Sequence, residues 1–287
     1  MTEHHVFSAD WLSLREPADH AARSEALFAE LARYLAARAT LDQALNIVDL
    51  GAGAGNNLRW LAPRLAQAQH WTLVDHDAGL LARATARALH PPAGQAISVQ
   101  TVEADLSNSA LPWIAGADLV AAAAFFDLVS SAWIERLSAA CATARVACLF
   151  ALSVDGRWDL IDHKGSIIND EDDRYLQYLF NQHQRRDKGL GAALGPDAAS
   201  VLAKRLAAHG LEVSTEPSDW RLAPGEPLSL ALGRELMSGW RLAALEQAPQ
   251  DSTRIESWHR RRQADLAAGR LGLGVGHLDI LALPPRP

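Results

Sequence analysis

Residues 46–57 set the strongest limit on the fold, because a short apolar run passes directly into three closely spaced glycines. The segment reads Asn-Ile-Val-Asp-Leu-Gly-Ala-Gly-Ala-Gly-Asn-Asn. Glycine allows a sharp turn of the backbone and a close approach to a ligand that a Cβ atom would exclude. The pattern predicts a buried β-strand near 46–50, a ligand-binding turn, and a helix that begins directly after it.

Similar apolar runs recur farther along the chain. They lie near 71–75, 97–102, 117–123 and 145–152, and alanine-rich helical stretches separate them. Intervals of about 20–28 residues are long enough for the helical crossovers that neighbouring parallel strands need. The alternation predicts an α/β fold in which helices cover both faces of a mostly parallel sheet.

The remaining sequence is predicted to be mainly helical. The first forty residues form a helical pattern, with Pro17 in a first turn and Leu27, Phe28, Leu31 and Leu35 on one later face. After a polar segment over 153–173, we expect helices near 171–186, 197–209, 226–246 and 251–268. Leu211–Thr215 and His277–Leu283 are predicted as a sixth and a seventh strand, with the glycine-rich Leu271–Gly276 as the turn into the last one.

Composition excludes several classes of function. With 49% hydrophobic and 21% charged residues, the 287-residue chain is typical of a globular protein. Its net charge of −7 gives no general attraction to phosphate backbones, which disfavours nucleic acid as a partner. Cys141 and Cys148 fit a reduced core. The first residues do not show a basic segment followed by an apolar run, and no 18 apolar residues occur in succession, so we expect neither a secretion signal nor a membrane span. We therefore expect a cytoplasmic protein with no membrane partner, and the excess of arginine over lysine suggests a GC-rich bacterial genome.

The spacing of the glycines distinguishes between two kinds of cofactor site. Dinucleotide-binding turns follow the pattern GxGxxG, whereas this turn is GxGxG with Asn56 in the final place. Asp49 lies two residues before Gly51. In this arrangement the segment closely resembles the first motif of class I S-adenosylmethionine (SAM)-dependent methyltransferases, and the resemblance extends in order and spacing over residues 46–152.

The resemblance implies a set of cofactor-binding residues. The first motif supplies Asp49, Gly51, Gly53 and Gly55. Asp75, at the end of the second predicted strand, occupies the position at which the family binds the ribose hydroxyls. Asp105 and Leu106 occupy the positions that accept from the adenine amino group and pack against its ring. Asp75 and Asp105 could instead be ordinary residues of a turn after a strand, and an acidic residue at the position of Asp75 also occurs in NAD-dependent enzymes.

The loop after the fourth predicted strand corresponds to the place where donor and acceptor meet in this family. Phe125 and Phe126 could pack against cofactor or substrate, or could be core residues. Asp127 could orient the acceptor, or could cap the helix that follows. The Asn-Pro-Pro-aromatic sequence of the DNA amino-methylating branch is absent here, which disfavours methylation of nucleic-acid bases by that route.

Two histidines and a cationic cluster are candidates for the acceptor side. His163 and His183 could act as a general base if the acceptor must lose a proton. Arg185, Arg186 and Lys188 could bind an anionic substrate, because guanidinium groups form paired hydrogen bonds with carboxylate or phosphate. The alternative is a solvated helix end whose cations interact favourably with the helix dipole.

Two further features have competing interpretations. The acidic run 170–173 could hold magnesium, but helix capping explains it more simply, so no metal site is predicted. Residues 11–20 could form a lid over the cofactor, with Arg15 on the methionine carboxylate. They could equally be a leader helix anchored by Trp11 and Leu14.

Together these features predict a Rossmann-like methyltransferase fold with a helical lid at 1–40, a SAM-binding core at 41–152 and a half at 153–287 that completes the sheet and carries a helical substrate-binding region. The expected reaction is direct in-line methyl transfer from SAM to a small-molecule acceptor, with an anionic molecule as one candidate. Its product from the donor is S-adenosylhomocysteine (SAH). We expect the protein to be a monomer or a homodimer. The alternatives are an NAD(P)-dependent oxidoreductase and a catalytically silent SAM-fold protein with a binding or regulatory role.

Overall fold

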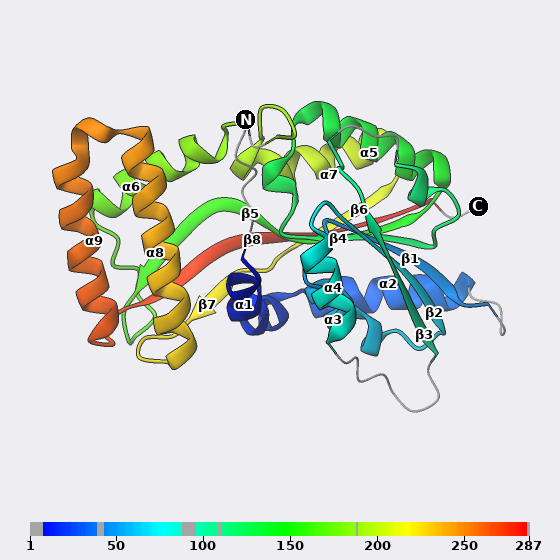
Figure 1. The fold of residues 1–287 in the computed structure, drawn as a ribbon, viewed down its shortest axis with the longest axis horizontal. Helices are drawn as coiled ribbons and strands as arrows, with labels where there is room; N and C mark the ends of the chain where they lie inside the picture. Colours follow the sequence, from blue (N-terminus) through cyan, green and yellow to red (C-terminus); the bar gives the residue numbers. More distant parts are fainter. Residues whose placement is uncertain (1–7, 39–42, 88–95, 108–110, 188, 286–287) are drawn as a thin grey trace.

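A computed structural model describes residues 8–38, 43–87, 96–107, 111–187 and 189–285. Its centre is an eight-stranded sheet in the order β3-β2-β1-β4-β5-β8-β6, with β7 also paired to β8 (Figure 1). The strands are β1 (Leu45–Leu50), β2 (Gln69–Asp75), β3 (Ile97–Glu103), β4 (Leu119–Ala123), β5 (Ala147–Ile161), β6 (Glu212–Pro217), β7 (Trp220–Leu222) and β8 (Gly272–Leu283).

The first five strands run parallel, and β8 is antiparallel to its neighbours β5, β6 and β7. The chain order reverses between β1 and β4, which leaves a crevice at the carboxyl ends of these two strands. The mostly parallel Rossmann-like sheet is therefore confirmed. The short strand β7 was not predicted.

Helices cover both faces of the sheet, as the sequence predicts. The α-helices of the described residues are α1 (Ala9–Ala22), α2 (Glu25–Arg38), α3 (Asn56–Leu61), α4 (Ala78–Ala86), α5 (Ser131–Ala144), α6 (Glu171–Gln184), α7 (Ala198–Ala208), α8 (Pro227–Gln247) and α9 (Ser252–Ala267). On one face, α2, α3 and α4 pack in a core that includes Leu31 and Trp60. On the other, α5 and α7 pack in a core that includes Trp133 and Leu202.

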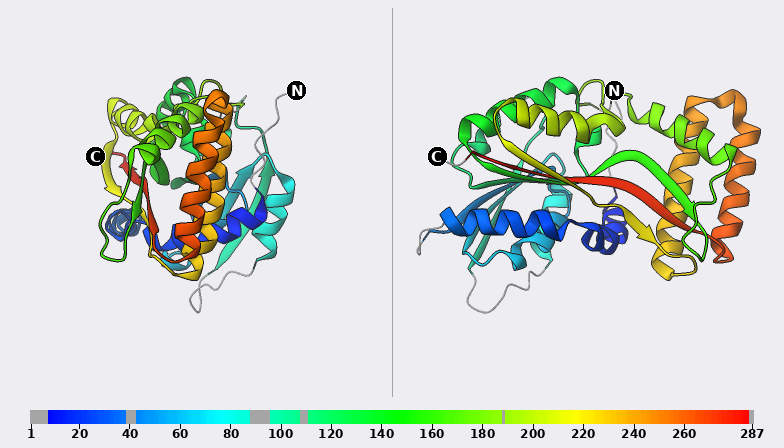
Figure 2. Two further views of the ribbon diagram at one scale, coloured as in Figure 1. Left: turned by 90° about the vertical axis from the view of Figure 1, so that its left-hand side faces the viewer. Right: turned by 180° about the vertical axis from the view of Figure 1, so that it is seen from behind.

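The strands β5 and β8 extend well beyond the core as a twisted antiparallel ribbon (Figures 1 and 2). The prediction that the fifth strand ends at Leu152 is wrong, because β5 continues to Ile161, which pairs with Gly272. The glycine-rich stretch before His277 is strand rather than turn. At the far end of the ribbon α6, α8 and α9 form a helical lobe with its own apolar core.

Helix α1 lies between the sheet domain and the helical lobe. Trp11 and Leu14 pack against the core of the lobe. On another side, Glu16 accepts two hydrogen bonds from Arg59 of α3, at 2.7 and 2.8 Å. Pro17 lies inside α1 and not in a first turn, so that part of the prediction is wrong.

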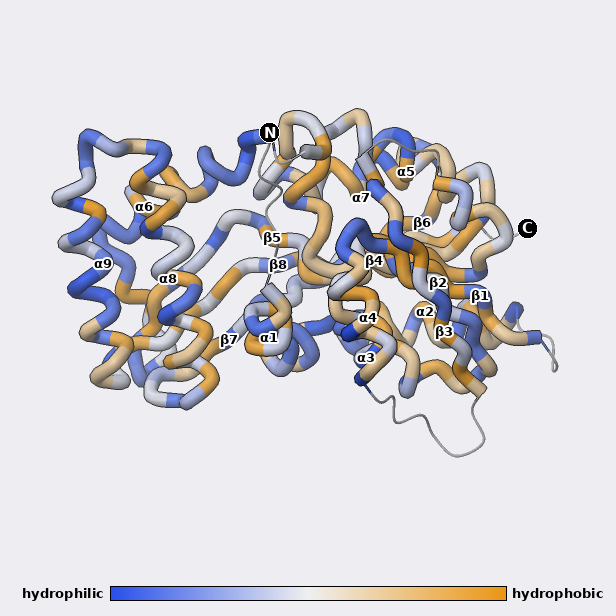
Figure 3. Tube along the Cα trace, viewed as in Figure 1, coloured by the Kyte–Doolittle hydropathy of each residue, from blue (hydrophilic) through white to orange (hydrophobic). Residues whose placement is uncertain are grey.

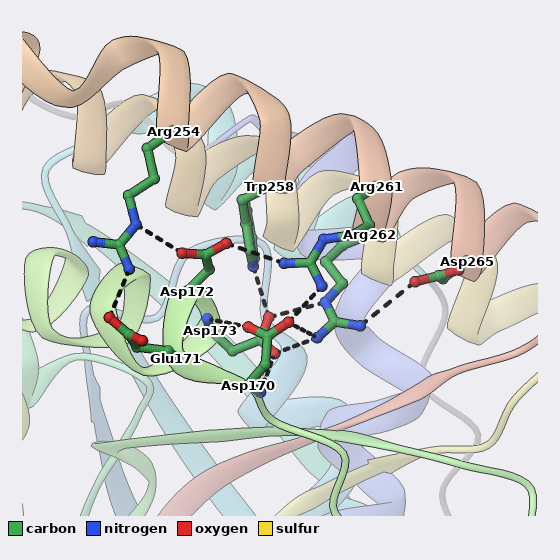
Figure 4. A network of polar contacts seen from close by, with 9 residues as sticks. All are labelled: Asp170, Glu171, Asp172, Asp173, Arg254, Trp258, Arg261, Arg262 and Asp265. Atoms are coloured by element: carbon green, nitrogen blue, oxygen red, sulfur yellow. Dashed lines mark hydrogen bonds and ion pairs between the residues drawn. The ribbon is translucent and has the colours of Figure 1, made fainter.

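The acidic run 170–173, which forms the N-cap and first turn of α6, has a structural role (Figure 4). Asp170 and Asp173 form a reciprocal capping box at the start of α6. Asp173 is fully buried, and it accepts hydrogen bonds from Trp258 Nε1 at 2.7 Å and from Arg262 Nε at 3.0 Å. This network fastens the first turn of α6 to α9, which confirms the capping interpretation.

Hydrophobic residues concentrate along the central strands, whereas much of α9 is hydrophilic (Figure 3).

Within the described ranges, no helix has the length and apolar character that would let it cross a membrane. The same residues contain no group of three or more histidine, cysteine, aspartate or glutamate side chains placed to hold a metal ion.

Candidate functional site

A cavity of about 400 Å³ opens at the carboxyl ends of β1, β2 and β4, where the order of the strands reverses. This volume is typical of small-molecule sites. Its walls come from α1, the glycine turn, the ends of β2 and β3, the loop after β4, and Gly189 with Leu190. The predicted residues Arg15, Asp49, Gly51, Gly53, Asp75, Asp105 and Leu106 all lie on these walls.

The three glycines of the turn have different surroundings. All have positive φ angles, 65° at Gly51, 51° at Gly53 and 78° at Gly55, which other residues adopt only with strain. A Cβ atom at Gly53 would approach only Leu12, at 3.5 Å, so this glycine borders open space. At Gly55 it would lie 2.9 Å from Ala84 of α4. Gly55 is therefore a packing glycine behind the turn and not part of the cavity wall.

Asp75 holds the glycine turn from the end of β2. Its Oδ2 accepts a hydrogen bond from the backbone N–H of Gly53 at 2.7 Å, and its Oδ1 accepts from Asp77 N–H at 2.9 Å. Asp77 in turn caps α4. A carboxylate oxygen can accept more than one hydrogen bond, so Asp75 keeps the capacity to bind hydroxyl groups of a ligand.

Asp49 is the most deeply buried carboxyl group of the cavity wall, with 0% of its surface exposed. Its Oδ1 accepts a hydrogen bond from Asn57 Nδ2 at 2.9 Å, and its Oδ2 has no hydrogen-bond partner among the described residues. Burial raises the pKa of Asp49 to about 7, against the opposing effects of Asn57 and the Arg23 guanidinium. A buried acceptor without a partner is costly and suggests a ligand donor.

The α1 side of the cavity carries an ordered cation. Arg15 donates two hydrogen bonds to the carboxylate of Asp19, at 2.9 and 3.0 Å. Asp19 also accepts from Asn56 of α3 at 2.7 Å and from Trp220 Nε1 of β7 at 3.1 Å. Leu12 completes this wall next to Gly53. The guanidinium of Arg15 is thus fixed at the edge of the cavity.

The opposite wall is largely apolar. Phe125 and Leu128, from the loop after β4, lie on it together with Leu190. At the end of β3, Asp105 is exposed and Leu106 is buried. The cavity therefore has a polar rim and an apolar interior on the β4 side.

The structure corrects the predictions for the β4 loop. Phe126 is fully buried and packs edge-on against Phe150, with ring centroids 4.8 Å apart, so the substrate role predicted for it is wrong and Phe125 occupies the wall instead. Asp127 is not among the wall residues, and it does not cap α5. Ser130 caps that helix by accepting from Trp133 N–H at 3.4 Å.

The predicted acceptor-side cations lie elsewhere on the surface. Arg185 donates to Asp197 at 2.9 Å, and Arg186 donates to Glu246 of α8 at 3.1 Å. His183 also contacts Glu246, at 3.0 Å. His163 lies in an exposed turn after β5. None of these side chains lines the cavity, and Lys188 lies outside the described residues.

Sequence reasoning missed several polar residues of the wall. They are Asp19, Asn56, Asn57, His76 and Asp77. The position of the two asparagines, directly after the glycine turn, was a usable signal because the start of that helix faces the ligand. Asp19 gave only the weak signal of an acidic residue four positions after Arg15.

Residues 47–146 match a family model described as a methyltransferase domain. The match runs from within β1 to just after α5 and therefore includes the glycine turn, Asp75 and Asp105. No curated protein matches the chain in sequence.

Among solved structures, the cyclopropane synthase MmaA2 from Mycobacterium tuberculosis has a TM-score of 0.48 and 12% identity, over 98% of this chain and 96% of that one. A SAM-dependent methyltransferase from Geobacter sulfurreducens, in complex with SAH, has a TM-score of 0.41 and 15% identity, over 96% and 97%. A phosphoethanolamine N-methyltransferase from Haemonchus contortus has 0.41 and 12%, over 98% and 59%. At these scores, the similarity gives no information about the acceptor.

Proposed function

We propose that the protein, whose residues 47–146 match the model of a methyltransferase domain, transfers the methyl group of SAM to a small-molecule acceptor, and that donor and acceptor bind in the cavity at the carboxyl ends of β1, β2 and β4. The observation that carries the proposal is the single cavity wall that joins the glycine turn, Asp75, Asp105 and Asp49 to the apolar β4 side. The fit of the donor and the character of the acceptor side add to this support.

The donor can be matched to the wall group by group. We propose that Asp105 and Leu106 contact the adenine and that Asp75 accepts from the ribose hydroxyls. The amino-acid portion then lies near α1, where Asp49 offers an unpaired acceptor and Arg15, which donates two hydrogen bonds to Asp19, has further N–H donors. An ammonium group suits the first and a carboxylate suits the second. This placement leaves the sulfonium next to the loop after β4.

The acceptor side supports catalysis by positioning. Phe125, Leu128 and Leu190 are apolar and exclude water from the point of transfer. Because the sulfonium is a good leaving group, holding donor methyl and acceptor in line supplies most of what the reaction needs. We propose an acceptor whose nucleophilic atom presents a lone pair without help from His163, His183 or Asp127.

The charges of the wall do not favour an anionic acceptor. Arg15 is the one arginine or lysine among the described residues that line the cavity, and it is already paired with Asp19. An acceptor with an uncharged, apolar reacting end agrees better with this wall than the anionic molecule considered from the sequence.

The cofactor assignment predicts a clear difference between two classes of nucleotide ligand. SAH at 100 times its dissociation constant should stabilise the fold by about 2.7 kcal/mol and raise the melting temperature, because it binds only the native state. NADH and NADPH should leave the melting temperature unchanged. Thermal unfolding monitored with each ligand checks this. Stabilisation by NADH and none by SAH would favour the oxidoreductase alternative.

Methyl transfer itself requires a second measurement. The protein should move isotope-labelled methyl from SAM to at least one member of a panel of small apolar aromatic amines and thioethers, whose nitrogen or sulfur atom carries a lone pair at neutral pH. Mass spectrometry identifies the methylated product, and the Gly53→Val variant serves as the inactive control. SAH binding without any transfer across such a panel would support the catalytically silent alternative.

Asp75 should contribute strongly to donor affinity. Replacement by alanine removes the proposed acceptor for the ribose hydroxyls and also the hydrogen bond that holds Gly53. We expect SAH binding to weaken by about 1.5–3 kcal/mol, the range for hydrogen bonds to a charged group. Calorimetric titration measures the change. The Ser130→Ala variant, which removes the cap of α5 and no group of the cavity wall, should keep its affinity.

A further inference from the structure

Asp49 is connected to a buried arginine behind the cavity wall through one asparagine. Arg23, directly after α1, donates from Nη2 to Asn57 Oδ1 at 2.6 Å. Asn57 donates from Nδ2 to Asp49 Oδ1 at 2.9 Å. The three residues are 4%, 3% and 0% exposed. A continuous chain of hydrogen bonds therefore runs from the cavity wall into the interior.

The chemistry of arginine fixes the direction of this chain of hydrogen bonds. A guanidinium group has only donors, so the amide oxygen of Asn57 must face Arg23. The amide nitrogen must then face Asp49 and donate to it. Asp49 is left with one oxygen, Oδ2, that no described residue contacts through a hydrogen bond. The arrangement favours a carboxylate at Asp49, because an ionised group accepts from the fixed amide donor more strongly than a protonated one.

We propose that Arg23 is a positioning residue for the cofactor, which acts through Asn57 to hold Asp49 as an ionised acceptor for the ammonium group of SAM. The inference rests on the proposed function, because it needs a ligand with an ammonium group next to Asp49. Arg23 does not itself line the cavity.

The charges around this chain come from several elements. Asp75 of β2 faces Asp49 and opposes its ionisation. Asp279 of β8 and Asp19 of α1 interact with Arg23 and offset its burial. Asp279 is itself held in place by backbone N–H donors of Ser24 and Leu152, both within 2.9 Å. On the ligand side, Arg15 is the nearby cation of the wall.

These groups predict how affinity for the donor depends on pH. Burial raises the pKa of Asp49 to about 7, and Arg23 and Asn57 oppose that rise. The free protein therefore binds a proton at Asp49 below pH 7, and the ammonium of the ligand must displace it. Affinity for SAH should fall up to tenfold per pH unit below the pKa of Asp49 and should level off above it.

The Arg23→Gln variant tests the proposal. Without the guanidinium charge, the pKa of Asp49 should rise, so the midpoint of the pH profile for SAH binding should move upward by about one pH unit or more. Affinity at pH 7 should fall accordingly. Calorimetric titration of SAH between about pH 5.5 and 8.5 measures the profile. Arg23→Lys, which keeps the charge, should move the midpoint back towards the wild-type value.

Two controls separate the proposed role from a general effect on the fold. Two guanidinium groups, those of Arg23 and Arg64, each lie 4.4 Å from the centroid of the Trp60 ring. Arg64→Gln removes the same kind of contact with the same ring but leaves Asn57 untouched, so its profile should match the wild type. Binding of 5′-methylthioadenosine, which lacks the amino-acid portion of the donor, should be equal in the wild type and in Arg23→Gln.

A second variant covers the case in which Arg23→Gln does not fold. Asn57→Ala breaks the chain of hydrogen bonds at its middle and should shift the SAH profile in the same direction. An unshifted profile in this variant, or an equal loss of 5′-methylthioadenosine affinity in Arg23→Gln, would overturn the positioning role while leaving the proposed function intact. Failure of the wild type to bind SAH at any pH would instead overturn the proposed function.

Discussion

Replacement of Gly53 by valine is expected to abolish binding of SAM and SAH while the sheet domain stays folded. The backbone at Gly53 has φ of 51°, and the space beyond its missing side chain leads into the cavity next to Leu12. A branched side chain would occupy this space and would resist the backbone conformation of the turn. We expect at least about a 100-fold loss of affinity, or roughly 2.8 kcal/mol, measured by calorimetric titration.

The control for this change is a valine at a glycine that also has a positive φ angle but lies away from the cavity. Gly210 follows α7 with φ of 87° and nothing within 4 Å of a Cβ atom. Gly210→Val should lower the melting temperature and leave SAH affinity unchanged. Circular dichroism verifies that both variants are folded. A folded Gly53→Val protein with wild-type affinity would show that the donor does not lie against this turn.

Removal of the Arg262 side chain should cost about 3–5 kcal/mol of stability in the helical lobe, the range for breaking a buried ion pair. Arg262 is 6% exposed, and it contacts both carboxylate oxygens of Asp173, which is fully buried. The Arg262→Ala variant leaves this carboxylate with Trp258 as its remaining side-chain donor. Hydrogen exchange of the amides in α6 and α9 should accelerate, and SAH affinity should be unchanged.

An exposed ion pair between the same two helices shows how much of the expected loss of stability comes from burial and how much from charge alone. Arg254 donates to Asp172 at 2.7 Å between the same two helices, but its side chain is 40% exposed. Arg254→Ala should therefore cost much less stability than Arg262→Ala. Urea unfolding of the two variants gives the comparison. Equal losses in the two would mean that the buried pair adds nothing beyond a surface contact.

The sequence was sufficient to predict those strands that consist of a single buried apolar run. The strands β1 to β4 agree with their predictions to within about two residues. The far part of the ribbon could not be predicted in this way, because its glycines resemble those of a turn. A Cβ atom at Gly272 would lie 2.1 Å from the carbonyl oxygen of Leu222, and one at Gly276 would lie 2.2 Å from Asp155. These glycines lie within a strand and allow neighbouring segments to approach it closely. Because those segments are distant in the sequence, local patterns do not reveal them.

The same division applies to the candidate site. Local motifs were enough to bring Asp49, Asp75 and Asp105 to one cavity, because each lies at or just after the carboxyl end of a strand at the same edge of the sheet. The choice between Phe125 and Phe126 was beyond sequence reasoning, because Ala124 has φ of 52° and breaks the alternation of the preceding strand. Arg185 and Arg186 pair with carboxylates that tertiary packing brings to them.

The long strand β8 has a consequence for how the molecule is assembled during synthesis. It lies between β5 and β6 in the sheet, and its pairing with β5 includes Cys148 opposite Ala282. The strand β6 is therefore joined to the sheet only through β8 among the described strands. Until the ribosome has made β8, β5 keeps an open edge and β6 has no attachment. The helical lobe between them must therefore emerge while the sheet is incomplete. Closure of the sheet is a late, long-range step, and the unpaired edge of β5 is the surface at which a nascent chain would associate wrongly with its neighbours.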